Sequence, residues 1–328
     1  MQALRTPIQA PAYPFAITYQ QPLMCIGSCF AERIGQRLTR QKFQVEVNPF
    51  GIVFNPLSIA RQLEYLCTES PIPAQMVIRH QELWHSLEHH GRFSHPDKFA
   101  FEQQLKDSLA NGRRQAAQSD ILVLTLGSAH VFVHQELNVP VSNCHKLPAK
   151  LFERIRPGVE TIVQALKTAL ALWKTRRPGL QVLISVSPVR YLREGLIENQ
   201  RSKATLILAV DELCRQLEYV HYFPAYEMVI DDLRDYRFFE TDMAHPTEQA
   251  VDYVWEHFVD ALIPLDQRAL MKQMDALQTA LQHRPLFPST LAHQHFIRQQ
   301  LLQIAQLQQT YSWLNLTHEQ ELLQQQLL

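Results

Sequence analysis

The chain has 328 residues, of which 46% are hydrophobic and 19% are charged, and its formal net charge is −1. This composition provides for a sizeable core and excludes the strongly basic surface that is typical of nucleic-acid-binding proteins. No apolar run approaches the ~20 residues needed to span a membrane, and residues 1–20 lack the apolar core of a secretory signal. We therefore expect a cytoplasmic protein with no membrane span and no nucleic-acid partner.

Four short apolar runs, each ending at Gly or Pro, are predicted to be buried strands: residues 23–27, 121–127, 181–188 and 218–224. Helical periodicity follows Ser28 and recurs over 158–174, 202–218 and 245–263, with Pro246 in the first turn of the last helix. Strands that alternate with helices predict an α/β fold with three layers, in which helices flank a central parallel sheet.

The composition changes near residue 265, where Gln and Leu become dominant. We predict an α/β domain over residues 1–264 and a helical extension over 265–328, with two helices broken at 284–288. The extension either packs on its own domain or forms a homodimer through its helices. Packing on the same chain is favoured because the heptad pattern is short.

Two nucleophilic side chains, Ser28 and Cys29, lie between the first predicted strand and its helix. Parallel sheets bind ligands at the carboxyl ends of their strands, where Ser128 and Ser187 also fall. Ser28 either caps the helix or acts as a nucleophile whose own N–H binds an oxyanion. Cys29 is the alternative nucleophile, because a helix N-terminus stabilises a thiolate. Adjacent residues cannot both face one histidine, and we favour Ser28.

A second candidate stretch holds Asp242 and His245, three residues apart before the last helix of the predicted α/β domain. A turn of this length lets the carboxylate accept a hydrogen bond from one ring nitrogen of the histidine. The other nitrogen is then free to take a proton from a serine. The alternative is that Asp242 caps a turn and His245 is an exposed turn residue.

Several stretches resemble the GSCFA-domain family, among them "GSCFAERIG" at 27–35, "VNPFGIVFNPLSI" at 47–59 and the segment 222–246. The resemblance covers roughly residues 20–260. The order Ser, Asp, His is similar to that of SGNH (GDSL-like) hydrolases. It implies that Ser28 is the nucleophile, His245 the general base and Asp242 the acid that orients it. It also implies that the N–H groups of Ser28 and Gly51 line the oxyanion hole.

The chain departs from the SGNH pattern at its third motif. SGNH hydrolases supply an Asn to the oxyanion hole there, and this sequence has Ala129 in "GSAH". Losing one such donor costs on the order of 10²–10³ in rate. Candidates to replace it are the Ser128 hydroxyl, Asn55 and Asn143, and the sequence does not choose among them.

Six polar residues are predicted to bind substrate at the rim of the cleft: Asn55, His85, His89, Asn143, His145 and Arg190. His85 and His89 have the i, i+4 spacing of a helical zinc site, but they lack the accompanying HExxH pattern. The five cysteines are dispersed and form no CxxC pair. We therefore predict no metal and no cofactor. For Arg190 the alternative is a structural salt bridge.

The resemblance implies a serine esterase acting on a small-molecule ester, possibly an acylated carbohydrate. Alternatives are an acyltransferase with the same triad and a non-catalytic binding module, the latter suggested by the missing Asn. A cysteine-dependent enzyme using Cys29 is a further alternative.

Overall fold

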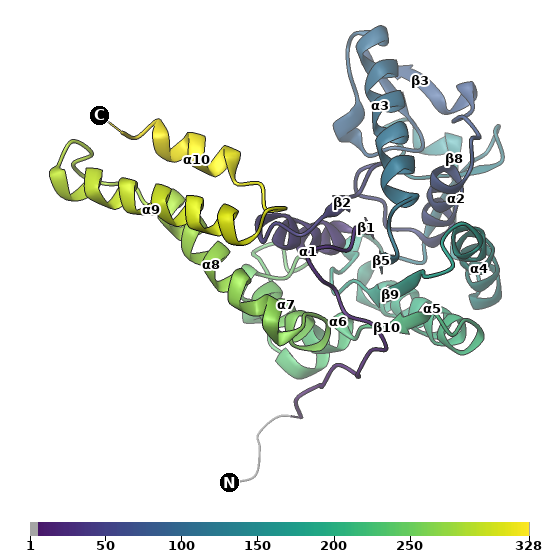
Figure 1. Ribbon diagram of the computed structural model, residues 1–328. Helices are drawn as coiled ribbons and strands as arrows, with labels where there is room; N and C mark the ends of the chain where they lie inside the picture. The colour runs from purple at the N-terminus through teal and green to yellow at the C-terminus, as the bar shows by residue number, and fades with distance from the viewer. Residues whose placement is uncertain (1–5, 328) are drawn as a thin grey trace.

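The central layer of the molecule is a five-stranded parallel sheet, seen in a computed structural model that describes residues 6–327 (Figure 1). Its spatial order is β10–β9–β5–β1–β2. The strands are β1 (Leu23–Gly27), β2 (Val45–Val47), β5 (Ile121–Leu126), β9 (Gln181–Val186) and β10 (Val220–Tyr222). The four predicted strands are confirmed. The short strand β2 was not predicted, because its three residues carry too little apolar pattern.

Side chains alternate along these strands and give each face of the sheet its own core. Cys25 and Val123 belong to one hydrophobic cluster, while Met24 and Leu124 belong to the other. Helices on the first face include α1 (Cys29–Arg40) and α7 (Glu248–Leu262). Helices on the second face are α2 (Pro56–Cys67), α4 (Val159–Arg176) and α5 (Gly195–Gln216). The predicted three-layer α/β fold is confirmed.

The predicted first-turn position of Pro246 is wrong, although the helix itself is present. Helix α7 begins at Glu248, and the side chain of Thr247 caps it by accepting a hydrogen bond from the N–H of Ala250. The threonine hydroxyl thereby satisfies one of the backbone N–H groups that the first helical turn leaves without a partner. Pro246 instead lies in an isolated antiparallel bridge with Phe239.

Two small antiparallel sheets form a lobe that the sequence pattern did not reveal. One pairs β3 (Val77–His80) with β4 (Leu83–Ser86), and the other has the order β7 (Val139–Val141), β6 (Val131–His134), β8 (Phe152–Ile155). The N–H of Ser142 donates to the carbonyl of Leu87 (2.8 Å) and joins the two. Helix α3 (Lys98–Ala116) packs beside them, and the short α6 (Ala225–Glu227) follows β10.

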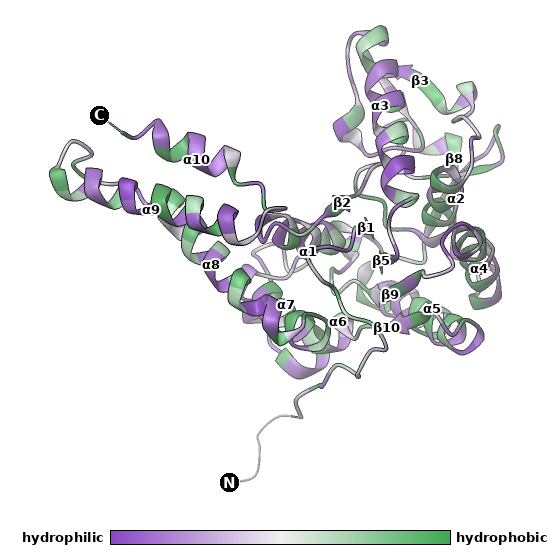
Figure 2. Ribbon diagram, viewed as in Figure 1, coloured by the Kyte–Doolittle hydropathy of each residue, from purple (hydrophilic) through white to green (hydrophobic). Residues whose placement is uncertain are grey.

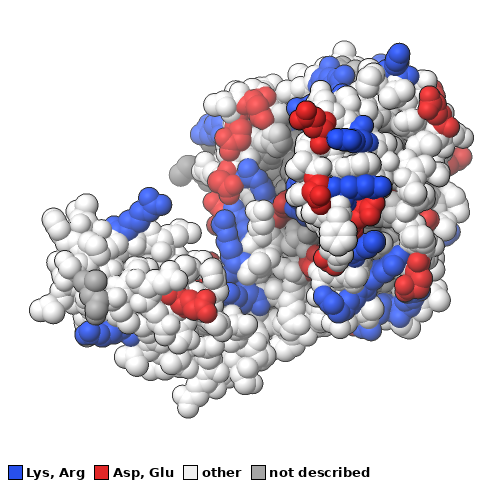
Figure 3. Space-filling view, turned by 90° about the horizontal axis from the view of Figure 1, so that it is seen from above, with Lys and Arg blue, Asp and Glu red and all other residues white. Residues whose placement is uncertain are grey.

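The C-terminal extension is an arm of three helices, α8 (Leu265–Gln282), α9 (Leu291–Thr310) and α10 (Thr317–Gln324), that projects from the body (Figure 1). The two predicted helices and their break are present, and α10 is additional. Each helix is striped with apolar and polar residues (Figure 2), and charges are sparse on the arm compared with the body (Figure 3). Met274, Ile297 and Leu323 continue the core cluster of the first sheet face. The homodimer stays a prediction.

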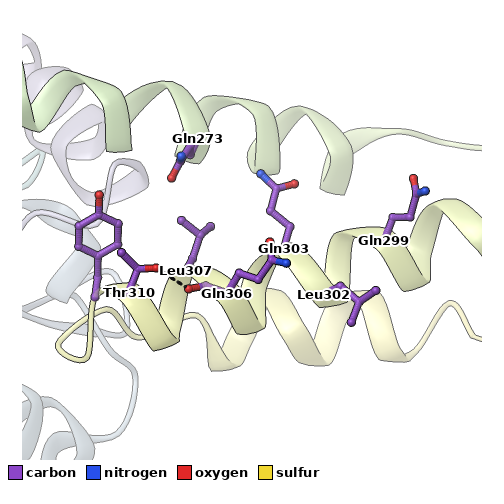
Figure 4. A pocket seen from close by; sticks show the side chains of 8 residues that line it. Gln273, Gln299, Leu302, Gln303, Gln306, Leu307 and Thr310 are labelled. Carbon is purple, nitrogen blue, oxygen red and sulfur yellow. Dashed lines mark hydrogen bonds between the residues drawn. The ribbon is translucent and has the colours of Figure 1, made fainter.

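A groove of about 570 Å³ lies between α8 and α9 (Figure 4). Half of its lining residues are glutamines, namely Gln273, Gln299, Gln303 and Gln306, and none of the lining residues is charged. It belongs wholly to the arm and contains none of the candidate site residues. None of the helices within residues 6–327 combines the length and apolar character needed to cross a bilayer.

Candidate active site

Ser28 lies directly after β1 and caps helix α1. Its Oγ accepts a hydrogen bond from the N–H of Phe30 (3.3 Å), and only 2% of the residue is exposed. Its own N–H donates to the carbonyl of Thr125 on β5 (3.0 Å). The sequence therefore places Ser28 correctly at the carboxyl edge of the sheet. The N–H that was expected to bind an oxyanion is already donated to a neighbouring strand.

Asp242 and His245 form the pair that their spacing predicted. Asp242 Oδ2 lies 2.6 Å from His245 Nδ1, while Oδ1 accepts the N–H groups of Ala244 (2.9 Å) and His245 (3.0 Å). These hydrogen bonds, the backbone N–H of His245 first, lower the pKa of Asp242 to about 2. An ionised Asp242 keeps the hydrogen of neutral His245 on Nδ1, so Nε2 is the proton acceptor. Both side chains are about half exposed.

Ionic and backbone contacts bring this turn to the same edge of the sheet as Ser28. Glu248, three residues after His245, pairs with Arg33 (2.5 Å) and Arg37 (3.0 Å) on α1. The N–H of Arg190, in the loop after β9, donates to the carbonyl of Ala244 (3.0 Å). Only β5 separates β9 from β1, a span of about 10 Å between strand axes. These contacts tie the Asp–His turn to helix α1 and to the loop after β9, and the assembly of the triad stays a prediction.

The other two predicted oxyanion donors are also occupied by the chain itself. Gly51 has φ +77° and donates its N–H to the carbonyl of Asn48 (2.7 Å). The Ser128 hydroxyl is 3.2 Å from Ser202 Oγ and accepts the N–H of His130 (3.1 Å). A donor that is already paired inside the protein gains little by turning to a substrate oxygen. The structure does not gather Ser28, Gly51 and Ser128 into one set of free donors.

Cys29 follows Ser28 but sits in surroundings that disfavour its thiolate. Burial raises the pKa of the Cys29 thiol, and the nearby Arg33 and Lys203 only partly oppose this effect. A thiol held in its neutral form is a weak nucleophile. This supports Ser28 over Cys29.

The three predicted histidines come together away from the Asp–His turn. His85 and His145 stack with ring centroids 4.6 Å apart, and His145 and His89 both contact Ser86. Burial lowers the pKa of His89 to about 3 and that of His145 to about 4, so both are neutral at physiological pH. His85 bonds Ser94 and the carbonyl of His80. These side chains form a packed, hydrogen-bonded cluster.

The helical zinc spacing of His85 and His89 does not exist in the fold, because His85 lies on strand β4. In a helix, residues i and i+4 lie on the same face, whereas here His85 and His89 are carried by a strand and the turn that follows it. Among residues 6–327, no group of three or more His, Cys, Asp or Glu side chains is arranged to hold a metal ion.

Asn55 and Asn143 line a cavity of about 530 Å³ beside the sheet edge. Asn55 caps α2 through Ser58 (2.8 Å) and also donates to the carbonyl of Val141 (3.3 Å). Phe54 forms part of the cavity wall, and its carbonyl accepts the N–H of Gly127 (2.8 Å) at the end of β5. The cavity therefore shares a wall with the strand end next to Ser28.

Arg190 makes no salt bridge among the described residues, and its predicted contact with substrate stays a prediction. Its guanidinium carbon lies 3.8 Å from the centroid of the Phe239 ring and 5.2 Å from that of Tyr236. This cation–π stacking holds the β9 loop against the segment that leads to Asp242. Arg190 positions the Asp–His turn in this structure.

The sequence is matched by two family models. The model of the GSCFA family covers residues 22–258, which is well over half of the chain. The chain belongs to the GSCFA family. A second model, the C-terminal domain of GSCFA domain proteins, covers residues 274–328. The gap between the two matches brackets the boundary predicted at 264/265, which stays a prediction.

One solved structure shows a distant likeness to this chain. A carbohydrate esterase family 3 protein from Talaromyces cellulolyticus aligns with 78% of this chain and 99% of its own, at 8% sequence identity and a TM-score of 0.36. Such a score is too low to transfer a fold or an activity. A search of curated proteins gives no match.

Lys203 on α5 is a residue of this GSCFA chain whose place at the site was not predicted. It is fully buried, and its Nζ donates to the carbonyls of Gly127 (2.5 Å) and Ser187 (2.6 Å), which follow β5 and β9. Burial lowers the pKa of Lys203 to about 7. The sequence did contain a sign of this role, because Lys203 falls on the apolar face of a predicted helix, together with Leu206 and Val210.

Proposed function

We propose that this protein is a serine esterase that hydrolyses a small-molecule ester, with Ser28 as nucleophile, His245 as general base and Asp242 as its orienting acid. The observation that carries the proposal is the 2.6 Å contact between Asp242 Oδ2 and His245 Nδ1. A carboxylate on Nδ1 fixes the tautomer in which Nε2 accepts a proton.

The proposed reaction follows from these roles. Ser28 Oγ attacks the ester carbonyl carbon while its proton passes to His245 Nε2. Asp242 stabilises the imidazolium, which then protonates the departing alkoxide. Water attacks the acyl-enzyme in the same way, and Ser28 is regenerated. An alcohol in place of water would make the enzyme an acyltransferase with an unchanged triad.

The cavity beside Phe54 is the proposed site for the acyl-sugar substrate. Its lining combines the aromatic rings of Phe54, Phe132 and Phe152 with the side-chain amide of Asn143. Aromatic faces pack on sugar rings and on acyl chains, and side-chain amides both donate to and accept from hydroxyl groups. This mixture supports an acylated carbohydrate over a purely aliphatic ester.

A second candidate, a binding module without catalysis, is favoured by one observation. Ser28 is 2% exposed and its hydroxyl already caps α1, so the side chain has a complete structural role without chemistry. In that reading the cavity binds its ligand and the ester bond is left intact.

Turnover of short-chain p-nitrophenyl esters and of acetylated sugars separates the two candidates. We expect Ser28→Ala to abolish activity. Ser187→Ala, which changes another serine placed directly after a strand, should keep activity within ~3-fold of the unmodified protein. Binding of an acetylated sugar with no turnover by the unmodified protein would favour the binding module.

A further inference from the structure

Tyr191 is held rigidly in the loop that follows β9. Its N–H donates to Asn199 Oδ1 (2.9 Å), and its ring lies 4.8 Å from the ring of Phe54. The ammonium of Lys203 lies 5.9 Å from the ring centroid. These contacts come from helix α5 and from the segment that precedes α2, and they leave the ring little freedom to turn.

The Tyr191 hydroxyl faces the same glycine as Ser28. A Cβ placed on Gly127 would lie 3.4 Å from Tyr191 Oη and 3.4 Å from Ser28 Cβ. The separation of Tyr191 Oη and Ser28 Cβ is therefore no larger than the sum of these two distances. Gly127 and Ala129 belong to the "GSAH" motif, in which the SGNH pattern would place the missing Asn.

The Tyr191 hydroxyl is a rigidly held donor in this neighbourhood that the described residues do not use. It makes no hydrogen bond to any residue in the described range 6–327, whereas the N–H groups of Ser28 and Gly51 donate to Thr125 and Asn48. Burial raises the pKa of Tyr191 well above its usual value, and Cys29 adds to this effect. The hydroxyl therefore keeps its proton at physiological pH.

We propose that Tyr191 is a catalytic residue whose hydroxyl donates a hydrogen bond to the oxyanion, in place of the Asn that the SGNH pattern supplies. The inference rests on the proposed esterase function. When Ser28 Oγ bonds to the carbonyl carbon, the carbonyl π pair moves to oxygen, and the Ser28 proton goes to His245. The Tyr191 O–H stabilises that oxygen without transferring its proton. When the pair returns to re-form the carbonyl, the alkoxide leaves with the proton from His245.

Tyr191→Phe tests the inference, because it removes the hydroxyl and keeps the ring. We expect kcat for a p-nitrophenyl ester to fall ~10²–10³-fold with little change in KM, as for the loss of one oxyanion donor. Tyr226→Phe is the matched control. The Tyr226 ring lies at the same 5.9 Å from Lys203, but its hydroxyl bonds Gln200 (3.1 Å). The control should keep kcat within ~3-fold of the unmodified protein.

Inhibition by a short alkylboronic acid is a second measurement, and it would not change if Tyr191 had a purely structural role. The boronate forms a tetrahedral anion on a nucleophilic serine, so its affinity follows transition-state stabilisation. We expect Tyr191→Phe to weaken inhibition by about the same factor as kcat/KM. Unchanged kcat and inhibition in Tyr191→Phe, with activity in the unmodified protein that depends on Ser28, would overturn the role of Tyr191 alone. No Ser28-dependent activity in the unmodified protein would overturn the esterase proposal and this inference together.

Discussion

Replacing Lys203 by Met removes a buried amino group that hydrogen-bonds to the residues directly after two central strands, β5 and β9. In the folded protein, burial lowers the pKa of Lys203 from 10.5 to about 7. The unfolded chain therefore holds this proton up to about pH 10.5, while the folded chain releases it near pH 7. The neutral amine still has two hydrogens for the carbonyls of Gly127 and Ser187.

The sign of the effect follows from these two pKa values. Between pH 7 and 10.5 the unfolded state binds more protons than the folded state, so the free energy of unfolding rises with pH, by at most ~1.4 kcal/mol per pH unit. Below pH 7 both states are protonated, and the folded state carries the full cost of burying the charge. The titration of Lys203 alone should therefore raise the free energy of unfolding by about 2 kcal/mol as the pH rises from 7 to 9.

Denaturant unfolding at pH 7, 8 and 9 measures this effect as the difference between the unmodified protein and Lys203→Met. Other titrating groups are common to both proteins and cancel. Lys167→Met is the control, because the ammonium of Lys167 bonds Gln216 at the surface (2.8 Å). The stability of the unmodified protein relative to Lys203→Met should rise with pH, and relative to Lys167→Met it should stay flat. A flat or falling difference for Lys203→Met would refute the reasoning.

Three further predictions concern the proposed triad. Asp242→Asn should lower kcat ~10³–10⁴-fold, because the amide faces Nδ1 and imposes the wrong tautomer on His245. Asp235→Asn is the control, because Asp235 is a nearby acid whose carboxylate accepts the backbone N–H of Arg237. This variant should keep kcat within ~2-fold of the unmodified protein. Equal losses of kcat in Asp242→Asn and Asp235→Asn would count against the Asp242–His245 pairing. Because the pKa of Asp242 is about 2, its carboxyl should stay ionised above about pH 4. An NMR titration of the Asp242 carboxyl carbon should show no protonation above that pH, and protonation there would contradict the pairing. Cys29→Ala should keep activity within ~3-fold, whereas a loss beyond ~10² would move the nucleophile to Cys29.

The parts of the fold that could be predicted are those with strong local patterns. Strand β1 is a continuous apolar run that ends at Gly27, and the spacing of Phe30, Ile34 and Leu38 marks the buried face of α1. The turn of Asp242 and His245 is likewise local, since both partners lie within four residues. In these cases the deciding interactions are close in sequence.

The parts that could not be predicted depend on contacts between distant segments. Ser28 donates its N–H to Thr125, almost a hundred residues later, so no local pattern could reveal that this donor is occupied. The spacing of His85 and His89 suggested a helix, but pairing with β3 makes His85 part of a strand. Tyr191 approaches Ser28 only because β9 and β1 flank the same central strand.

Labelling with a fluorophosphonate probe, followed by peptide mass spectrometry, tests the central claim most directly. The probe reacts with a serine that is activated by a neighbouring base, and it requires no knowledge of the natural substrate. We predict that a single adduct forms on Ser28 and that His245→Ala abolishes it. An adduct on any other residue, or none on Ser28 in the folded protein, would contradict the account.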